Sequence, residues 1–210
     1  MVLHLETLAP NARLTLDLFA QTNWVKKFYL AGGTALALHY GHRQSVDLDW
    51  FSQADFSTKE LLAKVSKLGK FELLNEEQNT LEGILDKTKV SFMTYPYPLL
   101  SKPAIFATRV SVACPLDIAL MKLTAISDRN TKKDFIDLYW YLQNENTDLL
   151  SLFAKMNKKF KGVNYNFAHI CKALVYFKEA DAQPMPKMIG SVDWEKIKKF
   201  IVSETRKMVV

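Results

Sequence analysis

Residues 28–52, FYLAGGTALALHYGHRQSVDLDWFS, decide the fold of this 210-residue chain. The apolar segment from Phe28 to Ala31 predicts a short strand. Gly32 and Gly33 then open a helix that is expected to end at Gly41, because glycine is favoured where helices stop. Alternation of polar and apolar residues over 46–51 predicts a second strand whose two faces differ. The predicted order is strand, glycine turn, helix and strand.

The second predicted strand carries Asp47 and Asp49, two residues apart, so both carboxylates are expected on one face of the sheet. Such a pair offers the hard oxygen ligands that Mg²⁺ takes together with substrate phosphates. Gly32 and Gly33 allow a close approach to the backbone, and the helix that follows offers free N–H groups to a phosphate. Each of these two features also occurs alone in ordinary turns and solvated strands. The combination of the glycine turn with the carboxylate pair predicts a site for a metal–triphosphate.

Hydrophobic periodicity in the rest of the chain predicts a mixed first part and a helical second part. In the first part, helices are expected over 11–27 and 57–68, and three antiparallel strands over 70–75, 80–85 and 89–95. After Pro115, helices are expected over 116–128, 131–144, 149–160, 167–177 and 193–208. We predict an α/β (α+β) domain with a mixed sheet over residues 1–112, followed by a helical domain over 113–210 that closes the site.

The composition favours an intracellular globular protein with an anionic partner. The net charge is +6 and 49% of the residues are hydrophobic, so the chain can bury a core and attract phosphates. Cys114 and Cys171 have no neighbouring Cys or His, which argues against a zinc site or a disulfide framework. No apolar run approaches the roughly 18–20 residues that span a bilayer. We expect a cytoplasmic protein without a membrane partner.

Two segments resemble a known family. Residues 28–52 are similar to the first motif of the polymerase-beta-like nucleotidyltransferase superfamily, in the form found in the AbiEii/AbiGii toxin family of abortive-infection and toxin–antitoxin systems. Residues 117–142, DIALMKLTAISDRNTKKDFIDLYWYL, resemble that family's later motifs in order and spacing, with Asp117, Lys122, Arg129, Asp134 and Asp137 at matching positions. The resemblance covers residues 28–142 and implies a nucleotidyltransferase fold.

The resemblance also implies roles for individual residues. The catalytic set would be Asp47, Asp49, Lys122 and Asp134, with Asp47 and Asp49 as the metal ligands. The nucleotide-binding set would be Gly32, Gly33, Thr34, Arg43, Ser45 and Lys122. Arg43 would neutralise phosphate, and Ser45 would bond to a ligand or fix the loop, although simple solvation of that loop explains both residues equally well. An ordinary surface ion pair between Lys133 and Asp137 is expected from their i,i+4 spacing.

The implied reaction is a transfer of a nucleoside monophosphate from an NTP to an acceptor, dependent on Mg²⁺ or Mn²⁺, with release of pyrophosphate. A tRNA or a protein would accept the nucleotide, and a cognate antitoxin would restrain the resulting toxin. One alternative is a nucleotidyltransferase that acts on a small molecule, which an acidic cleft would favour. A second alternative is a nucleotide- or RNA-binding module of the same fold without catalysis.

A departure from the superfamily pattern bears on that second alternative. Many members carry a third metal-binding carboxylate on a neighbouring strand, whereas the corresponding segment 89–93, KVSFM, has no acid. Asp86 is the nearest acid, and it lies in the preceding predicted turn. Either two aspartates suffice with an acid from the helical part, such as Asp134, or transfer is weak or lost.

Overall fold

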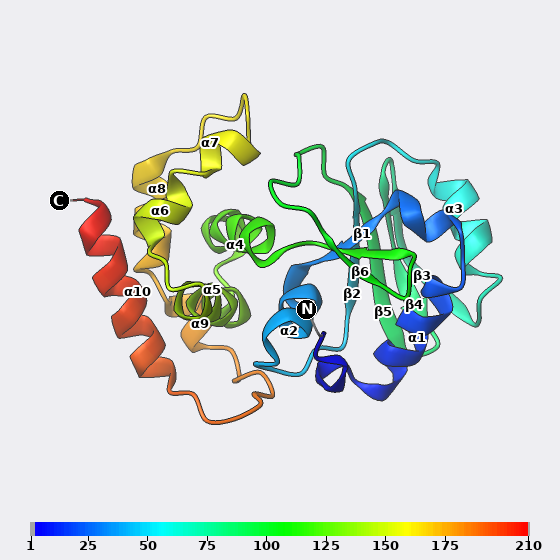
Figure 1. The fold of residues 1–210 in the computed structure, drawn as a ribbon, viewed down its shortest axis with the longest axis horizontal. Helices are drawn as coiled ribbons and strands as arrows, with labels where there is room; N and C mark the ends of the chain where they lie inside the picture. The colour runs from blue at the N-terminus through cyan, green and yellow to red at the C-terminus, as the bar shows by residue number, and fades with distance from the viewer. Residues whose placement is uncertain (1–2, 210) are drawn as a thin grey trace.

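The computed structural model describes residues 3–209, which form a β-sheet part and a helical part (Figure 1). The sheet in these residues has seven strands in the spatial order β3-β4-β5-β2-β1-β7-β6. The strands are β1 Tyr29–Ala31, β2 Leu48–Ser52, β3 Phe71–Glu77, β4 Thr80–Leu85, β5 Thr88–Thr94, β6 Ala104–Phe106 and β7 Val110–Val112. β1 is parallel to β7 and β2 is parallel to β5, while the other pairs are antiparallel. The predicted mixed sheet is confirmed.

The sheet part has three α-helices, which are α1 Pro10–Ala20, α2 Gly32–Tyr40 and α3 Thr58–Val65. The core of this part lies under α1. Phe19 of α1 packs edge-on against Trp50 of β2 and Phe92 of β5, with ring centroids 5.2 and 5.7 Å away. All three aromatic side chains are fully buried. Because side chains alternate along a strand, burial of Trp50 on this face places Asp49 on the opposite face.

The helix predicted over 11–27 is wrong in its length. α1 ends at Ala20, and a separate 3₁₀ helix, Trp24–Lys27, follows it. The Thr22 hydroxyl donates to the Phe19 carbonyl at 2.9 Å, and such side-chain bonds to nearby backbone compete with continuation of a helix. The helix predicted after the glycine turn is confirmed and stops at Gly41, which has a left-handed φ of 66°.

Two strands of the sheet were not predicted. β6 and β7 have three residues each and are joined by a tight turn in which Ala107 and Thr108 have positive φ angles of 47° and 66°. Three residues are too few to show a period of two, and the surrounding prolines indicated an irregular segment without helix or strand. β7 pairs with β1 and so extends the sheet beside the glycine turn.

Beyond Pro115 the regular elements in the described chain are all helical, as predicted. They are α4 Pro115–Arg129, α5 Lys132–Asn144, α6 Leu149–Phe153, α7 Met156–Lys159, α8 Phe167–Leu174, α9 Lys178–Asp181 and α10 Trp194–Met208. The single helix predicted over 149–160 is wrong, because α6 and α7 are separate. The separate α7 directs Lys159 into the interior, where its ammonium contacts Asp117 Oδ1 at 2.8 Å. No helix within residues 3–209 is long and apolar enough to cross a membrane.

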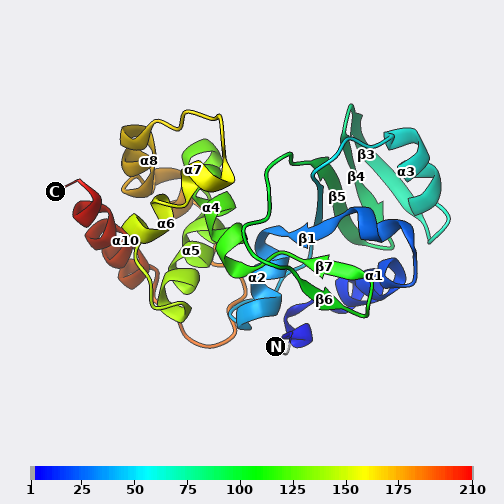
Figure 2. The same ribbon diagram turned by 45° about the horizontal axis from the view of Figure 1, so that its top comes forward.

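The helical part packs on the sheet part through α2, which contacts both α4 and α5 (Figure 2). A segment after α9 also returns to the sheet part. In it, Lys187 accepts a bond from the Gln44 N–H at 2.8 Å, and the Ile189 N–H donates to the His42 carbonyl at 2.9 Å. The segment after α9 therefore holds the loop between α2 and β2.

Candidate active site

The Gly32-Gly33 turn brings backbone against two charged side chains. Gly32 has a φ of 67°, and a Cβ at this position would lie 2.6 Å from Asp49 Oδ2. A Cβ on Gly33 would lie 1.9 Å from Arg43 Nη2. The first N–H groups of α2 have no intrahelical partner, so the turn presents donors and the positive end of the helix dipole beside Asp49. Glycine is required here by conformation and by space.

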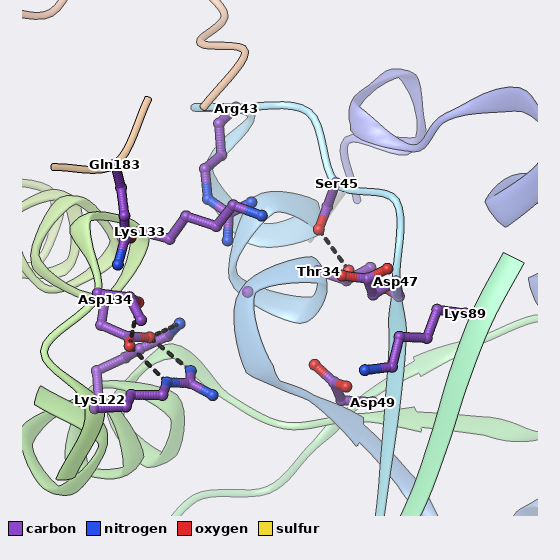
Figure 3. Close-up of a pocket in the computed structure, with 13 residues that line it drawn as sticks. Thr34, Arg43, Ser45, Asp47, Asp49, Lys89, Lys122, Lys133, Asp134 and Gln183 are labelled. Carbon is purple, nitrogen blue, oxygen red and sulfur yellow. Dashed lines mark hydrogen bonds and ion pairs between the residues drawn. The ribbon is translucent and has the colours of Figure 1, made fainter. Parts of the chain in front are cut away.

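Thr34 and Ser45 fix the loop that leads into β2. Thr34 is 1% exposed, and its hydroxyl lies 2.6 Å from that of Ser45 (Figure 3). The Thr34 hydroxyl donates to the carbonyl of Asp47, so the Ser45 hydroxyl donates to Thr34. These contacts support the loop-fixing role of Ser45. They leave the backbone N–H of Thr34 for the predicted phosphate contact.

Asp47 and Asp49 line the same pocket and are both half-buried. Asp49 lies in β2 as predicted, whereas Asp47 directly precedes the strand, which begins at Leu48. Burial raises the pKa of Asp49, the Asp47 carboxylate raises it further, and nearby cationic side chains oppose the rise. A divalent cation bound between the two carboxylates would relieve their mutual repulsion.

Lys122 of α4 is at the centre of a buried charge network. Its side chain is 6% exposed, and Nζ lies 2.7 Å from both Asp134 Oδ1 and Asp137 Oδ2 of α5. Burial would lower the pKa of Lys122, but the two carboxylates outweigh that effect and raise it. Both aspartates are fully buried, so this ammonium and its partners stay charged by mutual contact.

Asp134 is surrounded by donors. Arg129 donates to both of its oxygens, at 2.8 and 2.9 Å, and the Thr131 hydroxyl donates to Oδ2 at 2.6 Å. Burial would raise the pKa of Asp134, but the neighbouring Lys122 and Arg129 lower it to well below its usual range. Asp134 is therefore a charged carboxylate with both oxygens already engaged.

Arg43 joins the same network from the sheet part. It is 3% exposed and donates to Asp137 from Nε at 2.8 Å and from Nη2 at 3.0 Å. His42 Nε2 lies 2.8 Å from Asp137 Oδ1. Simple loop solvation of Arg43 is therefore wrong. The predicted surface pair between Lys133 and Asp137 is also wrong, because Asp137 points inward to partners from other elements.

A pocket of about 340 Å³ lies between the two parts (Figure 3). The sheet part contributes Gly33, Thr34, Arg43, Ser45, Asp47, Asp49 and Lys89. The helical part contributes Lys122, Arg129, Thr131, Lys133, Asp134 and Gln183. Of the predicted site residues, Gly32 alone is outside this lining, and it lines an adjoining recess. The fold thus brings together residues that are up to 150 positions apart in the chain.

Sequence reasoning did not assign Lys89 or Gln183 to the site. Lys89 lies in segment 89–93, which has no carboxylate, and its alternation with Ser91 is the signal that the two side chains share one face of the sheet. Gln183 follows the four-residue helix α9 in an irregular segment. No sequence pattern marks it, because only the return of this segment to the sheet part brings it to the pocket.

The adjoining recess, also of about 340 Å³, has a mostly apolar wall. Gly33, Asp49, Lys122 and Arg129 line both spaces. The apolar wall consists of Phe51, Met93, Tyr95, Ile118, Met121 and Ala125. Asp49 therefore lies between a charged space and an apolar space.

Asp47 and Asp49 are the residues that fit a divalent cation. No group of three or more His, Cys, Asp or Glu side chains within residues 3–209 is arranged to hold a metal ion. The residue opposite Asp49 on β5 is Ser91, and Asp86 instead accepts a bond from the Lys70 N–H at 3.0 Å. Mg²⁺ usually takes one or two carboxylates plus phosphate oxygens, so the pair is compatible with a cation whose further ligands come from a nucleotide.

This fold has a counterpart of known structure. MenT4, a nucleotidyltransferase toxin from Mycobacterium tuberculosis, matches with a TM-score of 0.53, covering 93% of this chain and 84% of that chain at 14% sequence identity. The predicted nucleotidyltransferase fold is confirmed.

Sequence comparison identifies the family. The model described as "Nucleotidyl transferase AbiEii toxin, Type IV TA system" matches residues 15–108 and 94–207. An uncharacterized protein from Aquifex aeolicus (strain VF5) is 37% identical over 187 residues, covering 82% of this chain and 84% of its own. The chain belongs to the AbiEii nucleotidyltransferase toxin family.

Proposed function

We propose that this protein transfers a nucleoside monophosphate from an NTP to an acceptor hydroxyl, with Mg²⁺ or Mn²⁺ held by Asp47 and Asp49. The pocket carries the proposal, because it sets this carboxylate pair beside the glycine turn and the N-terminus of α2. Five cationic side chains and three carboxylates line it: Arg43, Lys89, Lys122, Arg129 and Lys133 against Asp47, Asp49 and Asp134. This excess of positive charge suits a triphosphate. It is the reverse of the acidic cleft that a small-molecule transferase would favour.

In the proposed reaction, the acceptor oxygen forms a bond to the α-phosphorus of the NTP. The bond from that phosphorus to the bridging oxygen breaks, pyrophosphate leaves with the electron pair, and the acceptor's proton passes to water. A bound divalent cation would neutralise phosphate charge at Asp47 and Asp49. The N–H groups at the start of α2 would orient the phosphates, which matters because such transfer depends mostly on positioning and charge neutralisation.

The apolar recess is the proposed site of the nucleobase. It shares Gly33 and Asp49 with the charged pocket, so one NTP can reach both spaces. Phe51 and Tyr95 offer aromatic surface, and apolar walls with a few polar groups are typical of nucleotide-sized sites. The phosphates would then lie in the charged pocket.

The acceptor we favour is RNA, and specifically a tRNA, with a protein hydroxyl as the other outcome. The net charge of +6 favours an RNA backbone over an average protein surface. The family description names a type IV toxin–antitoxin system, so we propose that the transfer inhibits growth in the cytoplasm and that a cognate antitoxin restrains it.

The first experiment measures label transfer. The purified protein is incubated with Mg²⁺, each α-labelled NTP in turn, and either total tRNA or an RNA-free protein extract. We expect one acceptor to become labelled, and we expect Asp47→Asn combined with Asp49→Asn to reduce the rate by about a hundredfold or more, since a preorganised charge is lost. Asp55→Asn, an exposed change of the same kind in the loop after β2, is the control and is expected to retain the wild-type rate.

The outcomes separate the candidate functions. Undiminished transfer by the double variant would contradict the metal assignment. Binding of the Mg-nucleotide by the wild-type protein without transfer to any acceptor would favour the binding module. Labelling of a small molecule in a metabolite extract, with no labelled tRNA or protein, would favour the small-molecule transferase.

A further inference from the structure

Three of the pocket's cationic side chains are paired with the two buried carboxylates of Asp134 and Asp137. Arg43 forms two hydrogen bonds to Asp137, and Arg129 forms two to Asp134. Lys122 contacts both aspartates at 2.7 Å. A phosphate that attracted any of these three side chains would have to compete with a buried anion already in place. These contacts shape the pocket, and the three cations exceed their two carboxylate partners by one positive charge; Arg129, whose side chain is 62% exposed, is the only exposed cation of the three.

The other two cationic side chains are Lys89 and Lys133. Neither makes an ion pair with any residue in the described range 3–209. Both are exposed, and they line the pocket from opposite walls, Lys89 from β5 and Lys133 from α5. Figure 3 shows the Lys133 side chain extending from the helical part toward the sheet part and the Lys89 ammonium turned toward Asp49. Their charge is available to a ligand.

The strand register gives Lys89 a particular position. β2 and β5 are parallel, with Asp49 paired to Ser91. Side-chain alternation along β5 puts Lys89 on the same face as Ser91, and Asp47, which directly precedes β2, lines the pocket together with Asp49 and Lys89. An ammonium thus lies on the strand where a third carboxylate would otherwise help to hold a second metal ion.

Charge balance on this face suits one divalent cation. Two-metal sites hold their ions about 3.5–4 Å apart, which concentrates four positive charges. Asp47 and Asp49 supply two negative charges, and Lys89 adds a positive one that repels a second cation. Asp134 is not a substitute ligand, since both its oxygens accept bonds from Arg129 and Thr131.

We propose that Lys89 and Lys133 are the phosphate-binding cations of this site, and that Lys89 stands in place of a second metal ion, so that each site binds one divalent cation. This inference rests on the proposed function. One lysine comes from each part of the molecule, so a triphosphate bound between them also joins the two walls of the pocket.

The test measures nucleotide affinity by calorimetry, using an α,β-methylene NTP analogue with Mg²⁺. We expect Lys89→Gln and Lys133→Gln each to weaken binding by about ten- to a hundredfold, as loss of a hydrogen bond to a charged group does. The matched control is Lys87→Gln, which removes the same charge from an exposed lysine at the β4–β5 turn, where it lines a different recess. Its affinity is expected to match the wild type.

The wild-type protein is measured first, which separates this inference from the proposed function. Failure of the wild type to bind the Mg-analogue would contradict the proposed function itself. Wild-type binding that Lys89→Gln and Lys133→Gln leave unchanged would contradict only the assignment of these lysines. Electron paramagnetic resonance with Mn²⁺ then counts the ions in the complex with the analogue: one per chain is expected, and two would overturn the single-cation site.

Discussion

Gly33 is the residue whose size controls the contact between the glycine turn and the charge network. A Cβ there would meet Arg43 Nη2 at 1.9 Å and Asp137 Oδ2 at 3.2 Å. We expect Gly33→Ala to displace the guanidinium and to destabilise the protein by about 1–3 kcal/mol, the usual range for an overpacked interior. The free energy of unfolding in urea measures this effect.

A double-mutant cycle isolates the cause of that destabilisation. In an Arg43→Ala background the obstructing guanidinium is absent, so adding Gly33→Ala is expected to cost much less than it does in the wild type. Equal effects of Gly33→Ala in both backgrounds would show that the contact with Arg43 is not responsible.

At the scale of elements, one face of α4 lines both spaces of the site. Ile118, Met121, Lys122, Ala125 and Arg129 follow the i, i+3, i+4, i+7 and i+11 spacing that places residues on one side of a helix. The helix therefore presents charged groups to the pocket and apolar groups to the neighbouring recess. Its position fixes where the two spaces meet.

Filling the recess from α4 tests its assignment to the nucleobase. Ala125→Trp is expected to occupy this space and to reduce affinity for the NTP analogue by about tenfold or more, which corresponds to about 1.4 kcal/mol or more. Thr58→Ala on α3 lies outside both the pocket and the recess. This variant is the control and is expected to bind the analogue as the wild type does. If Ala125→Trp bound the analogue normally but lost transfer, the recess would belong to the acceptor instead.

For the whole molecule, the buried network is the electrostatic connection between its two parts. Arg43 and His42 precede β2, while Asp137 lies on α5, and the three meet with almost no solvent contact. Removing one member of a buried pair leaves an uncompensated charge. We therefore expect Asp137→Asn to destabilise the protein by about 3–5 kcal/mol at pH 7, measured by urea unfolding.

The same carboxylates predict how stability depends on pH. Burial would raise the pKa of Asp137, but Arg43 and Lys122 hold it well below its usual value, so the native state binds its proton less readily than the unfolded chain. Its contribution to stability is therefore present above about pH 4 and is lost as the pH falls toward the native pKa. Urea unfolding from pH 7 to 3 should show a steeper acid decline for the wild type than for Asp137→Asn. Parallel curves would contradict the assignment.

Much of the fold and of the site was predictable because the signals are local. The glycine turn, α2, the carboxylates of Asp47 and Asp49, the antiparallel strands and the helices after Pro115 all follow from spacing and periodicity along short segments. The family motifs supplied Lys122 and Asp134 as further site residues. The short strands β6 and β7 were not predicted, because three residues are too few to show the alternation of a strand.

The sequence by itself therefore determined the order of the longer strands and helices and indicated Asp47 and Asp49 as the proposed metal ligands. Only the tertiary structure decided which charges remain available, because an ion pair depends on which distant segments meet. It pairs Arg43 with Asp137, 94 positions away, and leaves Lys89 and Lys133 without carboxylate partners in the described chain. Burial and long-range contact set the electrostatics of a site, and neither is encoded in the spacing of residues along one segment.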